Sequence, residues 1–366
     1  METLFPPYID PIEKRLDVFY KKRLTLLEPY INQLGERWTD PQPGLIPRVI
    51  DDVGLGILSP YVPNLYDLYE EGWEWNKRRG TIKALYDGLS FLALTGTREL
   101  FPDRRKFWNS FNVHLEQIPT ADLLPNVAGV VNASKPECAD LMRVIHGYNI
   151  KPAEPSFSRL SNVHLSAGSG ARIDGVNSRF SFGEDRSFQI TLGEADIDQF
   201  GFYVAPGDAL PWKDVAQPWK DINVPWRDLG PGLAVANMAR QLVALGVFVG
   251  FYRPDGSLIG ARRVKALHQV QAGSTYKVGE DLVSPHINGS RILVEALTAF
   301  NDGAGELAQT VSLLFGASPK AGVKKGKRWL QPTELEFPFS AVGTQEIALR
   351  MTSTKRDRIR FLINFI

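Results

Sequence analysis

The side chains that most often do chemistry in proteins are few and scattered in this sequence. Its five histidines stand singly, and none is spaced from another histidine or a cysteine as zinc ligands are. They are His114, His146, His164, His268 and His286. The chain has one cysteine, Cys138, which excludes an intrachain disulfide and a paired-cysteine metal site and fits assembly in a reducing cytoplasm. We therefore predict no metal ion and no cofactor.

The sequence also lacks the common catalytic motifs. It has no HExxH, no GxxxxGK[ST] and no GxSxG, the signatures of zinc proteases, nucleotide hydrolases and serine hydrolases. The glycine-rich stretch "SAGSGAR", residues 166–172, precedes a strand-like pattern, whereas a phosphate-binding loop precedes a helix. We interpret it as a hairpin. No residue stands out as catalytic, and we expect a protein that is not an enzyme.

Three consecutive cations occur in "EWNKRRGTIKAL", residues 74–85. They could bind a nucleic acid or a phosphate, or they could stabilise the end of a helix. The chain has 42 Lys and Arg against 41 Asp and Glu, a net charge of +1, so it lacks the basic field of a nucleic-acid-binding protein. We favour the helix end. Lys77, Arg78 and Arg79 would then complement the negative end of a helix dipole, Gly80 would end that helix, and Thr81 would cap the next one.

Residues 77–81 form a basic junction between two predicted helices. The whole stretch 1–97 around it has the pattern of helices. Asp10 precedes Pro11 and stands three residues before Glu13, which is typical of a helix start, and Pro29 should kink or divide the helix that follows. The first residues lack the pattern of a secretory signal, and no run of 18 apolar residues occurs. We therefore expect a soluble protein with no membrane partner.

Beyond residue 97 the pattern changes to strands. Residues 98–155 are rich in charge and proline and are interpreted as a connecting region, and residues 156–208 as a β domain. A Pro/Trp segment spans 209–232, and 233–366 forms a C-terminal β-rich domain that begins with a helix at 233–245. The predicted fold class is a multidomain α+β protein, with an N-terminal helical domain followed by mostly antiparallel, sandwich-like β domains.

The Pro/Trp segment contains an internal repeat, "PWKDVAQPWKDINVPWRD". A proline every seven residues is incompatible with a helix, so we expect an extended strap. Its rings, Trp212, Trp219 and Trp226, are large enough that they must be covered by something. We favour a strap over the chain's own β domain. The other interpretation is a tether into grooves of a neighbouring subunit.

Three stretches of the first hundred residues, about a quarter of the chain, resemble one known family. They are "DPIEKRLD", "WTDPQPGLIPRVIDDVGLGIL" and "NKRRGTIKALYDGLSFLAL". Together they resemble the tail protein I family of contractile-tailed phages, a component of the baseplate wedge. That family has a basic H-R-[RK]-[KR]-G-T junction before a helix. Here Asn76 replaces the usual histidine and Ile82 a common proline.

The resemblance implies a structural subunit of the virion, placed in the tail baseplate and assembled in the host cytoplasm. Such a subunit joins two copies of a baseplate J-like protein in a wedge, and neighbouring wedges form a ring around the tail hub. Residues 77–81 and the three tryptophans of the strap are then candidate interface residues. The alternative is a carbohydrate- or receptor-binding tail protein, in which Trp rings would stay exposed beside polar groups to stack on sugars.

Overall fold

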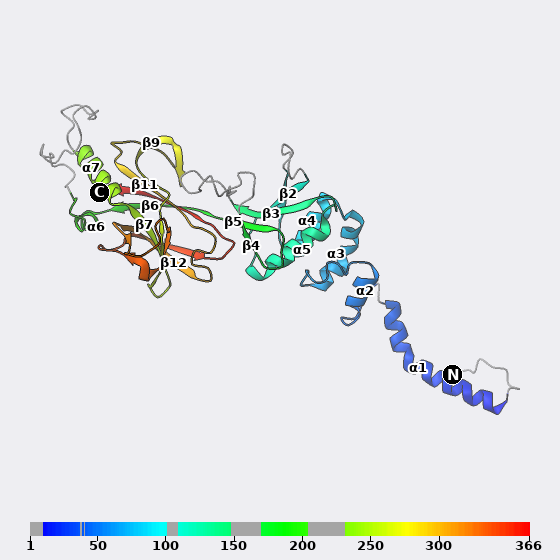
Figure 1. Ribbon diagram of the computed structural model, residues 1–366. Helices are drawn as coiled ribbons and strands as arrows, with labels where there is room; N and C mark the ends of the chain where they lie inside the picture. The colour runs from blue at the N-terminus through cyan, green and yellow to red at the C-terminus, as the bar shows by residue number, and fades with distance from the viewer. Residues whose placement is uncertain (1–9, 37–38, 40, 101–108, 148–169, 204–230) are drawn as a thin grey trace. The chain divides into compact units, whose positions relative to one another are not determined.

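A computed structural model gives the fold, and it describes residues 10–36, 39, 41–100, 109–147, 170–203 and 231–366 (Figure 1). The chain divides into two compact units. The first comprises Met1–Phe111 and Pro119–Leu141, and the second Asn112–Ile118 and Met142–Ile366. Helices precede a series of mostly antiparallel sheets, which confirms the predicted α+β fold class.

The first helix, α1, spans Pro11–Glu36. It begins as the sequence predicted, because the Asp10 carboxylate accepts a hydrogen bond from the Ile12 backbone N–H at 2.8 Å. Pro29 lies inside α1 and does not divide it. The sequence predicted that Pro29 would kink or divide the helix, and the division is wrong.

The next helices build a core around one tryptophan. They are α2 (Ile46–Asp52), α3 (Leu65–Arg78), α4 (Ile82–Ser90) and α5 (Leu124–Ser134), the last following a 3₁₀ turn, η1, at Ala121–Leu123. Trp75 of α3 is fully buried, and its indole N–H donates to the Ser134 hydroxyl of α5 at 2.9 Å. The buried polar atom of the ring is thus satisfied, as burial requires.

A five-stranded sheet follows in the order β1-β2-β3-β5-β4. Its strands are β1 (Gly96–Leu100), β2 (Ser110–Leu115), β3 (Asp140–Gly147), β4 (Ala171–Arg172) and β5 (Arg179–Gly183). β3 and β5 run parallel. The stretch 98–155, which the sequence suggested only as a connection, therefore contributes strands β2 and β3 and helix α5 to the fold.

Two further five-stranded sheets form the rest of the second unit, in the orders β10-β9-β11-β17-β6 and β14-β8-β7-β12-β16. Their strands are β6 (Asp185–Leu192), β7 (Val247–Tyr252), β8 (Leu258–Arg263), β9 (Ala266–Val278), β10 (Asp281–Pro285), β11 (Arg291–Leu297), β12 (Leu307–Phe315), β14 (Trp329–Leu330), β16 (Val342–Arg350) and β17 (Arg358–Phe365). A small pair joins β13 (Ser318–Pro319) to β15 (Leu335–Glu336), with a 3₁₀ turn, η6, at Pro332–Glu334. β17 with β6 and β3 with β5 are parallel pairs, whereas the pairs among β7–β17 and the pair of β4 with β5 are otherwise antiparallel.

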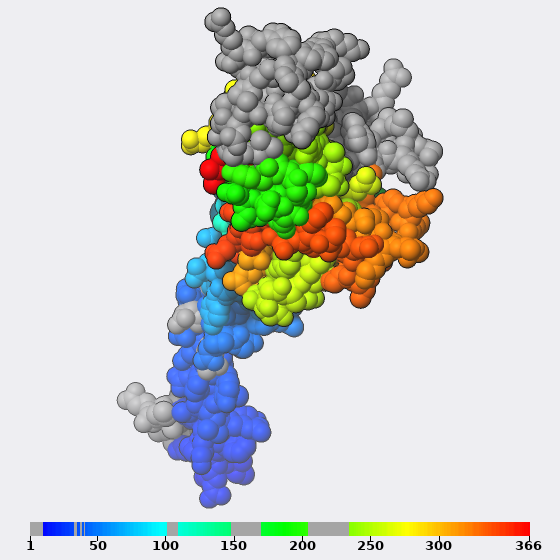
Figure 2. Space-filling model, turned by 90° about the vertical axis from the view of Figure 1, so that its left-hand side faces the viewer, coloured from blue at the N-terminus to red at the C-terminus, as the bar shows by residue number. Residues whose placement is uncertain are grey.

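One hydrophobic core connects these two sheets. Ile292 and Val294 of β11 and Phe361 of β17 belong to the same buried cluster as Val249 of β7 and Leu313 of β12. Two helices add to it, α6 (Glu194–Asp198) and α7 (Pro231–Leu245), and α7 lies beside β9 and β11 (Figure 1). Figure 2 shows the segments of this unit, green to red, packed into one continuous block. The arrangement is a β-sandwich.

A membrane-spanning helix needs about 20 consecutive, mostly apolar residues. The described helices do not meet this requirement.

A buried carboxyl near the start of β17 predicts a pH dependence of stability. Asp357 is 2% exposed and accepts a hydrogen bond from the Glu184 backbone N–H at 2.9 Å. Burial raises the pKa of its carboxyl from 3.8 to about 6, although the Lys355 ammonium, 3.7 Å away, lowers it. Between about pH 4 and pH 6 the folded chain therefore holds a proton that the unfolded chain has lost. Asp357 stabilises the fold fully at low pH, and this contribution disappears as the pH rises through about 6.

We expect Asp357→Asn to remove this dependence, because an amide still accepts the Glu184 N–H but does not titrate. The difference in unfolding free energy between the two chains should change by about 2–3 kcal/mol across this pH window. Urea unfolding of both chains at several pH values measures it. If the unfolding free energies of the variant and the parent change with pH in parallel, Asp357 does not titrate in this pH window.

Candidate functional site

The basic junction closes one helix and opens the next. Lys77 and Arg78 lie in the last turn of α3, Arg79 is its C-cap, and Gly80 follows with φ +85°. A side chain would be strained at that φ, so a glycine suits the position. Thr81 is the N-cap of α4, and its hydroxyl accepts a hydrogen bond from the Ala84 N–H at 3.2 Å. The sequence-based prediction of both caps is confirmed.

The cations of the junction have partners within the first unit. Lys77 pairs with Glu74 at 2.7 Å, and its ammonium lies 5.5 Å from the centre of the Trp73 ring. Arg78 bridges Glu74 and Asp87, each at 3.3 Å. The Lys77 side chain is 53% exposed and that of Arg78 37%, so both remain reachable from solvent. A role in contacting a neighbouring subunit stays a prediction.

The junction also has a structural role that the sequence did not reveal. The Arg79 Nε donates to the Ala133 carbonyl oxygen at 3.1 Å, and the Gly80 N–H donates to the Ser134 carbonyl oxygen at 3.0 Å. Both acceptors belong to the last turn of α5, whose carbonyls have no partner within their own helix. The junction thus fixes the end of a helix more than 50 residues away. No local pattern signals a contact of that range.

We expect the Thr81 cap to be measurable in the full chain. Thr81→Ala should lower the local stability of α4 by about 1 kcal/mol, because the Ala84 N–H loses its acceptor, whereas Thr81→Ser should change it little. Hydrogen exchange of α4 amides gives the local unfolding free energy. Equal protection in the two variants would contradict the cap.

The second group of predicted interface residues is the strap. Trp212, Trp219 and Trp226 lie outside the residues that the structure describes. Whether the strap covers its own chain or a neighbour stays a prediction.

Helix α1 carries an exposed apolar surface. Ten large hydrophobic side chains of this one helix are each 48% to 68% exposed. They are Ile12, Leu16, Val18, Phe19, Tyr20, Leu24, Leu26, Leu27, Tyr30 and Ile31. Tyr20, Leu24, Leu27 and Ile31 follow one another at steps of four, three and four residues, the spacing of a coiled-coil seam. The sequence shows this periodicity. It does not show that these apolar side chains remain uncovered.

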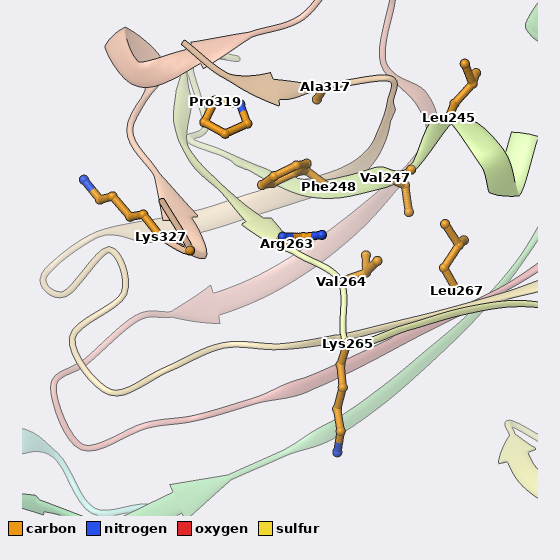
Figure 3. A pocket seen from close by; sticks show the side chains of 12 residues that line it. Leu245, Val247, Phe248, Arg263, Val264, Lys265, Leu267, Ala317, Pro319 and Lys327 are labelled. Carbon is orange, nitrogen blue, oxygen red and sulfur yellow. The ribbon is translucent and has the colours of Figure 1, made fainter. Parts of the chain in front are cut away.

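Several cavities open on the two units. In the first unit, Val53 and Leu55 with Tyr69 and Trp73 of α3 line an apolar cavity of about 500 Å³. In the second unit, a cavity of about 430 Å³ has an apolar wall that includes Val247, Phe248 and Val264. Figure 3 shows that the Lys265 and Lys327 side chains extend away from this wall. These lysines therefore do not gather into an anion site there.

No three His, Cys, Asp or Glu side chains among the described residues lie together as ligands of an ion would.

Comparison with known proteins adds no assignment. None of the models of known protein families matches the chain, and no curated protein matches it. The resemblance of the first hundred residues to tail protein I therefore stays a prediction.

Proposed function

We propose that this protein is a structural subunit of a contractile phage tail baseplate. In this role it is a wedge component that joins two copies of a baseplate J-like protein next to the tail hub and the neighbouring wedges. The observation that carries the proposal is the apolar surface of α1, defined by the ten exposed hydrophobic residues of that helix. An uncovered patch of this kind marks a protein–protein or membrane interaction site, and the proposal assigns it to a protein partner.

The energetics of α1 support an assembly role. Burying a large apolar side chain stabilises an interface by about 1.5–3 kcal/mol. Covering the four residues of the seam, Tyr20, Leu24, Leu27 and Ile31, therefore gives at most about 6–12 kcal/mol, because these side chains are only 52% to 63% exposed to begin with. Association itself costs roughly 4–15 kcal/mol. The seam alone is marginal, so the exposed apolar side chains beside it on the helix, Leu16 and Tyr30, would have to add to the contact.

The charge pattern of α1 agrees with a neighbouring protein as its partner. Lys21 pairs with Asp17 one turn earlier at 3.0 Å, and the remaining charged residues of α1 have both signs. A helix that packs on a nucleic acid would carry an excess of cations. The half-exposed Lys77 and Arg78 add polar groups of the kind found at the rim of an interface.

The experiment that tests the proposal is affinity isolation of the tagged chain from a lysate in which tails assemble. We expect it to be recovered with a baseplate J-like protein, in about one copy for two of the partner, in particles that sediment far faster than the free chain. Recovery of the chain only as a free protein would contradict the proposal.

A second candidate function is carbohydrate or receptor binding by the same tail protein. One observation favours it. The partly exposed ring of Trp329 lines a cavity of the second unit beside polar side chains, which is the arrangement expected of a sugar platform.

A further inference from the structure

We propose that the cavity beside Trp329 binds an uncharged pyranose saccharide. The cavity has a volume of about 510 Å³, within the range of roughly 300–1,000 Å³ typical of ligand sites. It is bounded by the ends of the β7–β8 turn, by the loop before β12 and by the start of β14. The inference deepens the second candidate function, on which it rests, and it does not depend on the baseplate role.

Trp329 provides a fixed aromatic surface. One side of its ring packs against Gly260, where a Cβ atom would come within 2.4 Å of the ring, and its centre lies 5.6 Å from that of Phe251. The ring is therefore held in place, and part of it lines the cavity. The negative face of an indole attracts the weakly positive C–H groups on the apolar face of a pyranose. A rigid, partly exposed tryptophan is suited to this stacking.

Arg253 and Glu306 supply oriented polar groups beside the ring. The Arg253 guanidinium donates two hydrogen bonds to the Glu306 carboxylate, at 2.8 and 2.9 Å, and a third to the Ser257 hydroxyl at 3.1 Å. A guanidinium has five N–H groups, so within the described part of the chain two of them are left for a ligand. The carboxylate keeps further acceptor positions. A donor and an acceptor side by side match the neighbouring hydroxyl groups of a sugar.

The loop that carries Asn301 on the cavity wall is held by buried contacts. Asp302 forms an ion pair with Arg262 at 2.9 Å, with both side chains less than 10% exposed, and accepts the Ala299 N–H at 2.7 Å. The Met351 N–H donates to the Glu306 carbonyl oxygen at 2.9 Å. Because the wall is ordered before a ligand arrives, binding loses less conformational entropy.

The charge of the site favours a neutral ligand. Arg253 and Glu306 balance each other, and the remaining polar residues on the cavity wall, Asn301 and Gln331, are uncharged amides. Hydrogen bonding to Arg253 keeps the pKa of the Glu306 carboxyl below its usual value, so the pair remains charged and balanced at neutral pH. An anionic or cationic ligand would gain little electrostatic free energy on binding here. Amides and an ion pair are suitable hydrogen-bond partners for hydroxyl groups.

The test is calorimetric titration of the full chain with maltotriose, cellotriose, mannotriose and triacetylchitotriose. We expect at least one of them to bind with a Kd of about 1 mM or tighter. Arg253→Ala and Trp329→Leu should each weaken that binding at least about tenfold, since each removes a direct contact. Arg263→Ala is the matched control: this exposed arginine of β8 does not line the cavity and should bind as the parent does.

A further variant separates loss of binding from loss of folding. Asn301 has φ +73°, which glycine adopts without strain, so Asn301→Gly removes the amide and keeps the loop. It should bind measurably more weakly while melting close to the parent. The proposal is wrong if none of the four trisaccharides binds, or if all the cavity variants bind as tightly as the parent. Either result leaves the baseplate proposal intact, because that proposal is tested through α1.

Discussion

A chain with glutamine in place of Leu24, Leu27 and Ile31 is expected to fold and yet fail to enter a baseplate. These side chains are 52% to 63% exposed, so the isolated chain should lose little stability when they become polar. In an interface each replacement removes about 1.5–3 kcal/mol of apolar burial and leaves an amide to be desolvated. The three together should weaken association by a factor of at least about 10³.

The matched control changes the opposite face of the same helix. Arg15→Gln, Lys22→Gln and Thr25→Gln introduce the same residue type in the same number, roughly opposite the seam at 100° per residue. Both chains are added to a lysate that lacks the natural chain, and the assembled tails are collected by sedimentation. We expect the control and not the seam variant in the tails. Equal incorporation of the two would show that the apolar face of α1 is not the contact.

Replacing Trp75 by alanine is expected to have the largest effect on stability in the first unit. The ring is fully buried, and its N–H donates to Ser134, whose own hydroxyl donates to the Val130 carbonyl oxygen at 2.7 Å. Removing a buried tryptophan costs about 3–5 kcal/mol, because the cavity that remains does not collapse fully. The loss should appear as faster hydrogen exchange throughout α3, α4 and α5.

Trp73 provides the comparison, since it lies two residues earlier on the same helix and is 52% exposed. Trp73→Ala should change the stability by no more than about 0.5 kcal/mol, apart from the loss of its contact with Lys77. If Trp75→Ala and Trp73→Ala reduce hydrogen-exchange protection equally, Trp75 is not at the centre of this core.

Much of the fold could be read from the sequence where local chemistry decides it. Asp10, Gly80 and Thr81 act at helix ends through contacts within a few residues, and all three were predicted. The helix at 233–245 was also predicted, and it ends before Gly246, which adopts a positive φ.

What the sequence did not reveal depends on contacts between distant residues. Strands β2 and β3 lie in a stretch whose composition suggested a connection, and β3 pairs with β5, more than 30 residues later. The Arg79 contact with Ala133 and the gathering of Arg253, Glu306 and Trp329 around one cavity likewise join residues far apart in the chain. Periodicity and capping rules describe neighbours in sequence, so they predict elements better than sites.

Cross-linking of purified tails tests the central claim most directly. Lys14, Lys21 and Lys22 lie on α1, within reach of any protein that covers its apolar face. If the chain is a wedge subunit held by α1, mass spectrometry of cross-linked tails should join these lysines to a baseplate J-like protein. Tails that lack the chain, or in which these lysines are joined only to their own chain, would contradict the account.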